Sequence, residues 1–340
     1  MGRINRNKQQ EIQNVDNILS AFTDNERAAL EKYFQSRFKS GGRSTSSKAI
    51  GIMGDIHCGS DLAVAPMDKI KYKHQEDLLN WWDHCVDTFN DQHLHKLILN
   101  GEPIDGLNKK EFGDDVETKI HEQFEAAAKL ITRIHYDGLR MTSGSGYHVR
   151  EGGAFFEEMF AKYLPKVEKS QYIFQQQVQL LTQQQQNRQV ASGKQMLQIK
   201  DMTENGIYAP LFFNLMVNNK LLNVSHHIAF SRWWAYRTTA LAREMLEMEP
   251  LRGKLYPADR NIDILVRSHV HYFVEVGFIN TYGFTTPAWK FPGKFEFRRG
   301  LGGTYPTIGA ILIIIEQNGE WSRKKLVAPQ SELPPPTLEY

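Results

Sequence analysis

The chain has 340 residues, 41% of them hydrophobic and 24% charged, and a mass of 39.2 kDa. These values are close to globular averages and exclude a wholly disordered or fibrous protein. Lys and Arg number 41 against 39 Asp and Glu, so the formal net charge is +2. That balance neither requires nor excludes a nucleic-acid partner, because binding depends on local charge.

The number of cysteines and the hydropathy of the sequence indicate the cellular compartment of the protein. The two cysteines, Cys58 and Cys85, are too few for a disulfide framework and favour a reducing environment. The first residues lack the apolar core of a signal peptide, and the longest apolar run, 310–315, is only strand-sized. We therefore expect a cytoplasmic protein without membrane contact.

Residues 1–40 predict a helical N-terminal extension. Apolar residues between Val15 and Phe22 have helical spacing, and Thr23 to Glu26 forms a capping box for a second helix. The Gly- and Ser-rich residues 41–47 predict a linker. An appendage that packs on the main body or on a partner protein is favoured over a small DNA-binding helix pair.

Residues 48–325 predict one α/β domain. Apolar strands are expected at residues 49–53, 97–99, 139–142, 221–224 and 262–266, with helices at 69–89 and 116–136. Strands that alternate with helices favour a sheet with parallel strands. A binding site is then expected outside the carboxyl ends of those strands.

Five further segments differ from this pattern in composition or spacing. Residues 171–198 contain twelve glutamines, and we expect this Gln-rich insert to be a mobile surface loop, with an exposed helix or a partner surface as alternatives. Residues 274–279 and 309–315 have strand patterns. Residues 290–299 are basic and aromatic, which fits a nucleic-acid contact or an edge strand. The Pro-rich residues 326–340 predict an extended tail.

Polar side chains follow each of the five expected strands of the α/β domain. In chain order they are Asp55 and His57, Glu102, His148, His226, and finally His269 and His271. Carboxylates and imidazoles without thiolates suit Mn, Fe, Ni or Zn. Two such ions bridged by one carboxylate are a standard means of hydrolysing phosphate esters.

The motifs that carry these residues are Gly54-Asp55-Ile56-His57, Asn100-Gly101-Glu102, Gly146-Tyr147-His148, His226-His227 and Ser268-His269-Val270-His271. In this order they resemble those of the calcineurin-like metallophosphoesterase superfamily over residues 48–290. The resemblance implies an α/β fold in which two β-sheets form a sandwich flanked by helices. Residues 285–289 extend the similarity to phosphoesterases of phages and prophages.

The resemblance also implies a role for each residue. Two divalent metal ions are expected, with manganese favoured over iron, nickel or zinc. The first ion would be held by Asp55, His57 and His271, the second by His226 and His269, and both by Glu102. His148 would be the catalytic proton donor to the leaving group. His227 is the alternative in the fourth motif.

Two arginines are candidates for substrate binding. Arg150 follows His148 and Arg232 follows His226, and a guanidinium group can contact two phosphate oxygens at once. Exposed arginines without a role are the alternative.

Two positions depart from the family pattern. Glu102 stands where the family has Asp, and Asp105 is the next candidate for the bridge. Tyr147 stands where the family has an Asn ligand, so the second ion would need water, Ser145 or another group.

Together these residues predict a metal-dependent phosphoesterase that uses a metal-bridging hydroxide. A phosphodiester is the favoured substrate, with nucleic acid or a nucleotide as its class. The alternative is a non-catalytic scaffold with a degenerate metal site, which would bind protein partners through the N-terminal and Gln-rich segments.

Overall fold

The computed structural model describes a defined part of the chain, all of it in one unit that spans residues 47–340. The described residues are 47–106, 119–145, 150–151, 154–170, 207–231, 233–248, 262–278, 280–293, 306–331 and 333. Several predictions fall outside them, namely those for the helical extension 1–40, most of the linker, the Gln-rich insert, His148, Arg232 and Pro334 to Pro336. The backbone of Arg150 is described but its side chain is not.

The first sheet has five strands. Their order is β12 (Trp321–Val327), β11 (Gly309–Ile315), β1 (Lys48–Met53), β2 (Leu94–Asn100) and β3 (Tyr136–Thr142). Strands β1, β2 and β3 are parallel, whereas β11 is antiparallel to both of its neighbours. The parallel strands therefore end at one edge of the sheet.

The second sheet also has five strands. Their order is β6 (Phe212–Val217), β7 (Lys220–Ser225), β8 (Ile264–Arg267), β10 (Tyr282–Thr285) and β9 (Glu275–Gly277). Strands β7, β8 and β10 are parallel, and the two edge strands run antiparallel to them. Two short strands, β4 (Arg150–Glu151) and β5 (Ala154–Phe155), form a separate hairpin.

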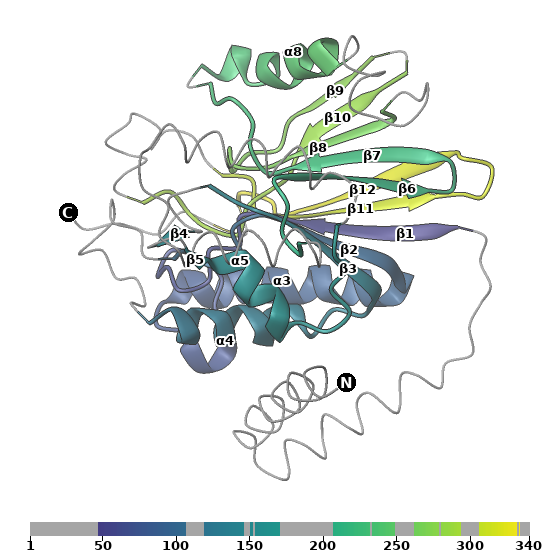
Figure 1. Cartoon of the computed structure of the whole chain (residues 1–340). Coiled ribbons are helices and arrows are strands. Elements are labelled where there is room, and N and C mark those ends of the chain that lie inside the picture. Colours follow the sequence, from purple (N-terminus) through teal and green to yellow (C-terminus); the bar gives the residue numbers. More distant parts are fainter. Residues whose placement is uncertain are drawn as a thin grey trace, which may run out of the picture. The chain divides into compact units, whose positions relative to one another are not determined.

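Helices cover the outer faces of both sheets, as Figure 1 shows. Helices α3 (Lys73–Gln92), α4 (Ile120–Ile131) and α5 (Phe156–Phe160) lie on the side of the first sheet, and α8 (Thr239–Met248) lies on the side of the second. Among the described residues, three short 3₁₀ turns connect elements, η1 (Met67–Lys69), η2 (Ala161–Tyr163) and η3 (Trp234–Tyr236). The predicted fold class, an α/β sandwich of two sheets flanked by helices, is confirmed.

The alternation of side chains along β1 and β11 builds two cores. Ile50 and Ile52 pack between the sheets with residues such as Val266 and Phe284. Ala49 and Met53, which flank this pair and point to the opposite face, pack instead against the helices. Strands buried on both faces read as continuous apolar runs, which explains the uninterrupted sequence of β11.

Local details differ from the sequence prediction. Helix α3 begins at Lys73 rather than Lys69, because residues 67–69 form η1 and Tyr72 and Gln75 make a capping box. The expected tail is also partly built into the domain: β12 continues to Val327, and Leu333 is buried in the helix-side core. Apolar side chains upstream of the prolines can still pack, so a tail beginning at residue 326 is wrong.

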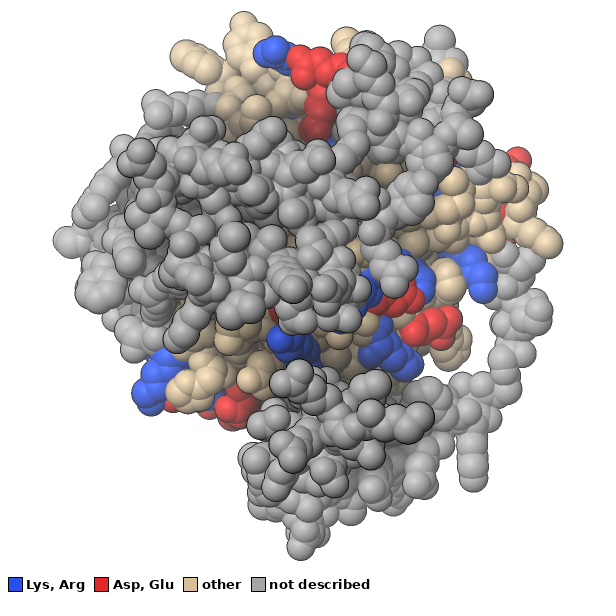
Figure 2. Space-filling model, in the orientation of Figure 1, with Lys and Arg blue, Asp and Glu red and all other residues tan. Residues whose placement is uncertain are grey.

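The described surface carries both signs of charge. In Figure 2, Lys and Arg side chains are interspersed with Asp and Glu over the described part of the face shown. Ion pairs of the described surface include Lys129 with Asp68 at 2.6 Å and Arg133 with Asp83 at 2.8 Å. Within the described ranges, no helix has the length and apolar content needed to span a membrane.

Gly309, at the start of β11, tests the packing of the first sheet. Its φ is +146°, and a Cβ there would lie 1.9 Å from the carbonyl oxygen of Leu326. We expect Gly309→Ala to lower the free energy of unfolding by roughly 2–4 kcal/mol in urea denaturation, because the backbone of β12 must move. Gly319→Ala is the control, with φ +84° but no atom nearer than 3.6 Å, and should lose only ~1 kcal/mol. Equal losses in both variants would contradict the clash.

Candidate metal centre

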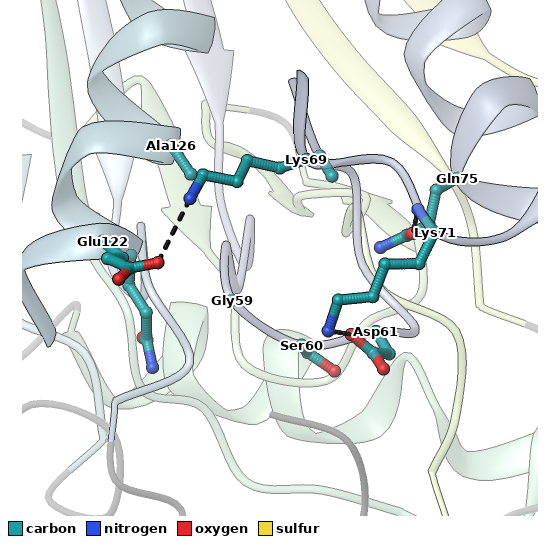
Figure 3. Close-up of a pocket in the computed structure, with 10 residues that line it drawn as sticks. Gly59, Ser60, Asp61, Lys69, Lys71, Gln75, Glu122 and Ala126 are labelled. Atoms are coloured by element: carbon teal, nitrogen blue, oxygen red, sulfur yellow. Dashed lines mark hydrogen bonds and ion pairs between the residues drawn. The ribbon is translucent and has the colours of Figure 1, made fainter. Parts of the chain in front are cut away.

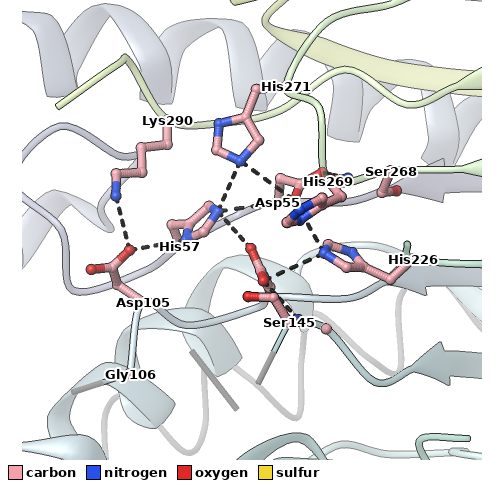
Figure 4. A network of polar contacts seen from close by, with 12 residues as sticks. Asp55, His57, Asp105, Gly106, Ser145, His226, Ser268, His269, His271 and Lys290 are labelled. Atoms are coloured by element: carbon pink, nitrogen blue, oxygen red, sulfur yellow. Dashed lines mark hydrogen bonds and ion pairs between the residues drawn. The ribbon is translucent and has the colours of Figure 1, made fainter. Parts of the chain in front are cut away.

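The predicted ligands meet where four strands end. Asp55 and His57 follow β1, Glu102 follows β2, His226 follows β7, and His269 and His271 follow β8. Strands β1 and β2 belong to the first sheet and β7 and β8 to the second, so both sheets contribute to the centre. Figure 4 shows the side chains converging from these loops.

The backbone at these positions is strained. Five of the six predicted ligands have a positive φ, the exception being His226. The values are 50° for Asp55, 52° for His57, 49° for Glu102, 71° for His269 and 55° for His271. A positive φ is uncommon outside glycine and costs about 1–3 kcal/mol per residue, so such positions concentrate at functional sites.

Gly101 allows the sheets to approach each other here. Its φ is +79°, and a Cβ would lie 2.2 Å from Nδ1 of His226. The Asn100-Gly101-Glu102 turn therefore requires glycine in the middle, since any side chain would displace the His226 ring.

The first cluster of ligand atoms surrounds His57. Its Nε2 lies 3.0 Å from Oε2 of Glu102 and 3.2 Å from Nε2 of His271. Oδ1 of Asp55 lies 3.5 Å from Nε2 of His271 and 3.9 Å from Nε2 of His57. One atom from each of these four residues lies within 4.8 Å of the others, a spacing that a single metal ion can bridge.

The second cluster shares Glu102 with the first. It consists of Glu102, His226 and His269, whose ligand atoms also lie within 4.8 Å of one another. Oε1 of Glu102 is 3.4 Å from Nε2 of His226, whereas Oε2 faces His57. The carboxylate of Glu102 thus presents one oxygen to each cluster.

Two buried polar atoms at this centre make no hydrogen bond. They are Oδ1 of Asp55 and Nε2 of His226, which are 3.8 Å apart in fully buried residues. Burying a polar atom without a partner costs free energy, and a cation between them would satisfy both atoms. The donor set of imidazole nitrogens and carboxylate oxygens therefore fits divalent metal ions.

The acid–base groups of the centre perturb one another strongly. Burial disfavours the charged form of His57, but the charge of Glu102 and the hydrogen bond to Asp105 outweigh it and raise its pKa to about 10. Burial is likewise outweighed at His226, where Glu102 and Asp55 raise the pKa to about 9. Burial disfavours ionised Asp55, yet the charges of His226 and His271 lower its pKa. Without metal, protons on His57 and His226 thus balance the carboxylates.

A second layer of residues orients the ligands. Nδ1 of His57 donates to Oδ1 of Asp105 at 2.9 Å, and Lys290 contacts the same oxygen at 3.0 Å. Nδ1 of His226 donates to the carbonyl oxygen of Asn100 at 2.9 Å. Each contact fixes the ring tautomer, so that Nε2 faces the cluster.

Asp105 therefore lies behind His57 rather than between the clusters. It is not the alternative bridge that the sequence left open. Lys290 is only 1% exposed, and Phe291 is fully buried, so the start of the basic stretch 290–299 forms part of the core. A nucleic-acid contact by these two residues is wrong.

The loop after β3 supports Glu102. The backbone N–H of Ser145 donates to Oε1 of Glu102 at 2.8 Å, and the Ser145 hydroxyl is buried without a hydrogen-bond partner. Glu157 accepts the N–H of Gly144 at 3.1 Å. Burial raises the pKa of Glu157 to about 8, although this hydrogen bond acts in the opposite direction. The sequence analysis missed Glu157, because nothing in its local pattern separates it from an ordinary helical glutamate.

The other residues predicted to belong to the site lie partly within and partly outside the described residues. His227 is exposed, with its ring centroid 5.0 Å from that of His269. It belongs to neither ligand cluster of the described residues. His148, Arg232 and the side chain of Arg150 lie outside the described residues, so their roles stay predictions.

A separate pocket lies beside Gly59, in the loop that follows His57. It has a cavity volume of ≈ 50 Å³ and is lined by Gly59, Ser60, Lys69 and Lys71, among others (Figure 3). Lys69 pairs with Glu122 at 3.1 Å and Lys71 with Asp61 at 2.9 Å. Each lysine thus has a carboxylate partner within the protein, and none of the residues that line the pocket belongs to a metal-ligand group of the described residues.

Comparison with known proteins finds similarity only among solved structures. No protein-family profile matches the chain, and no curated protein sequence matches it. Vps29 of Entamoeba histolytica, solved in complex with zinc, aligns at 10% identity over 82% of this chain and 98% of its own, with a TM-score of 0.35. A novel archaeal phosphodiesterase aligns at 12% identity over 82% of this chain and 99% of its own, with a TM-score of 0.32.

A predicted phosphoesterase from Streptococcus pneumoniae aligns similarly, at 9% identity over 82% of this chain and 98% of its own, with a TM-score of 0.29. Similarities at this level carry no functional argument.

The titrating groups predict how the metal-free protein responds to pH. In the folded state His57 and His226 keep their protons to about pH 10 and 9, whereas in the unfolded chain both titrate near 6.5. Glu157 likewise keeps its proton to about pH 8. Because the folded state binds more protons above pH 6.5, stability must fall as pH rises from 6.5 to 9.

We expect a loss of ~2 kcal/mol or more over this range in urea denaturation with EDTA present. Saturating Mn²⁺ is the control, since metal replaces the protons and the dependence should flatten. Stability that is constant or rising with pH in EDTA would contradict the assigned protonation.

The contact between Asp105 and His57 predicts a loss of metal affinity in Asp105→Asn. The amide keeps the shape of the side chain but removes the charge that orients the imidazole, so the Kd for Mn²⁺ should rise ~10–100-fold by calorimetry. Asp263→Asn is the matched control, because Asp263 pairs with Lys220 at the opposite end of β8. A wild-type Kd in Asp105→Asn would show that His57 needs no such support.

Proposed function

We propose that the protein is a metal-dependent phosphoesterase with two divalent ions. The observation that carries this proposal is the pair of ligand clusters that share the buried carboxylate of Glu102. The resemblance of the five motifs to those of the calcineurin-like metallophosphoesterases supports it independently.

The residues would divide between the two ions as the clusters divide. Asp55, His57 and His271 would hold one ion, His226 and His269 the other, and Glu102 both. Manganese is favoured, with iron, nickel or zinc also suited to these donors. Bound there, the ions would supply an activated water molecule and neutralise charge on the phosphoryl oxygens.

The protein's own groups prepare the centre for this role. Glu102 is buried beside His57 and His226 and raises the pKa of both, so that without metal these imidazoles carry protons that the ions would displace. Asp105 and the carbonyl of Asn100 fix the two imidazoles, so little reorganisation accompanies metal binding. The Ser145 hydroxyl, unpaired beside Glu102, is the proposed replacement for the Asn ligand that Tyr147 displaces.

Substrate handling is assigned to residues around this centre. We propose that His148 donates a proton to the leaving-group oxygen and that Arg150 and Arg232 bind non-bridging phosphate oxygens. A phosphodiester, with nucleic acid or a nucleotide as its class, is the proposed substrate. Kinship with phage and prophage enzymes is part of the proposal and is based on the general character of the sequence, including residues 285–289.

Hydrolysis of bis-(p-nitrophenyl) phosphate by the purified protein with Mn²⁺ tests the function. Glu102→Gln should bind at least one ion fewer by metal analysis and lose activity, because two cations would face each other without the bridging charge. Glu320→Gln, at an exposed carboxylate, is the control and should match the wild type.

Two outcomes contradict the proposal. Wild-type metal content and rate in Glu102→Gln would exclude the bridge. Full metal loading of the wild type without turnover of any diester or monoester would favour the scaffold alternative.

A further inference from the structure

A group of exposed aromatic side chains follows β7. It consists of Phe230, Trp233, Trp234 and Tyr236, which we call the aromatic rim. Their exposed fractions are 41%, 72%, 80% and 60%. All four lie within seven residues of the chain, and exposed large apolar side chains that are close together mark a binding site more often than isolated ones do.

The aromatic rim is connected to the metal centre at both of its ends. Phe230 is the third residue after His227. Beyond Tyr236, the guanidinium group of Arg237 lies 4.6 Å from the ring centroid of Tyr272, the residue that follows His271. The rim is thus anchored to the loop that supplies the last two predicted ligands.

The charge of this segment complements a phosphate chain. Residues 228–242 contain two arginines, Arg232 and Arg237, and no Asp or Glu. Aromatic rings in a segment that carries arginines and no carboxylates suit a single-stranded nucleic acid, whose bases stack on the rings and whose phosphates are not repelled. A protein partner that binds through apolar contacts would use the rings, but it would gain no affinity from the positive charge of the segment.

We infer that the aromatic rim binds the bases of a single-stranded nucleic acid next to the phosphodiester held at the metal centre. The inference rests on the proposed function, because it assigns the substrate class of that same site. The segment acts as a stacking platform, so the strand is held by its bases and the reacting phosphate is directed to the ions.

Binding of two matched strands by the full-length protein with Mn²⁺ tests the inference. One probe is a ten-nucleotide thymidylate strand with phosphorothioate linkages, which resists hydrolysis. The other is an abasic strand with the same linkages and the same charge. Fluorescence titration should give a Kd at least ~10-fold lower for the strand with bases, a difference that stacking of one or two bases supplies.

The double variant Trp233→Ala/Trp234→Ala should reduce that ratio to about one without changing the hydrolysis of bis-(p-nitrophenyl) phosphate more than ~2-fold. Tyr163→Ala, at an aromatic residue 53% exposed on η2, is the control and should keep the ratio. Circular dichroism checks that the variants are folded. If a variant does not fold, the ratio of the two affinities on the wild-type protein still tests the inference.

Equal affinity for both strands, or no binding of either, would overturn the inference. So would a double variant that keeps the wild-type ratio, or one that only changes the oligomeric state in light scattering, which would assign the aromatic rim to protein contact. These results leave the proposed function intact. Failure of the proposed function is recognised separately, by the absence of bis-(p-nitrophenyl) phosphate hydrolysis in the wild type.

Discussion

The carboxylate of Glu102 is the contact on which the whole site depends. Its Oε2 lies 3.0 Å from His57 on the first sheet's side, and its Oε1 lies 3.4 Å from His226 on the second sheet's side. The carbonyl oxygen of the same residue accepts hydrogen bonds from the backbone N–H groups of Ile56 and His57 at 3.0 and 2.9 Å. Side chain and backbone of one residue therefore join the β1 loop, the β2 loop and the second sheet. A shift of Glu102 would displace both ligand clusters together.

The centre contains buried charges and strained backbone, both of which lower the stability of the folded protein. Left-handed backbone at five ligand positions and unpaired buried atoms at Asp55 and His226 each cost free energy. The apolar cores on both faces of the first sheet hold these loops in place. Proteins retain such destabilising features where a bound ligand offsets their cost in free energy. Cations at this centre would offset it here.

The sequence predicted the strands and the convergence of their ends for clear physical reasons. The apolar runs of β1, β2, β7 and β8 are strong local signals, and parallel strands bring their carboxyl ends together. That rule brings Asp55 and Glu102 together at one edge of the first sheet. His226 lies 171 positions after Asp55 and follows a strand of the second sheet, so its place beside them was predicted by the resemblance of the motifs.

Other features depend on contacts that no local pattern encodes. Lys290 reads as part of an exposed basic stretch, but it is buried against Asp105, which lies 185 residues earlier in the chain. The exposure of Trp233 and Trp234 is equally invisible in sequence, because tryptophan is common in cores and the motif-rich segment around it has no clear period. Glu157 is a third case, since only the fold shows that its carboxylate holds the loop beside Glu102.

The most direct test of the account is anomalous diffraction at the manganese edge from crystals grown with Mn²⁺. A two-ion centre predicts one peak on each side of the Glu102 carboxylate. One peak should lie among Asp55, His57 and His271, and the other beside His226 and His269. A single peak, or two peaks that do not share Glu102, would contradict it.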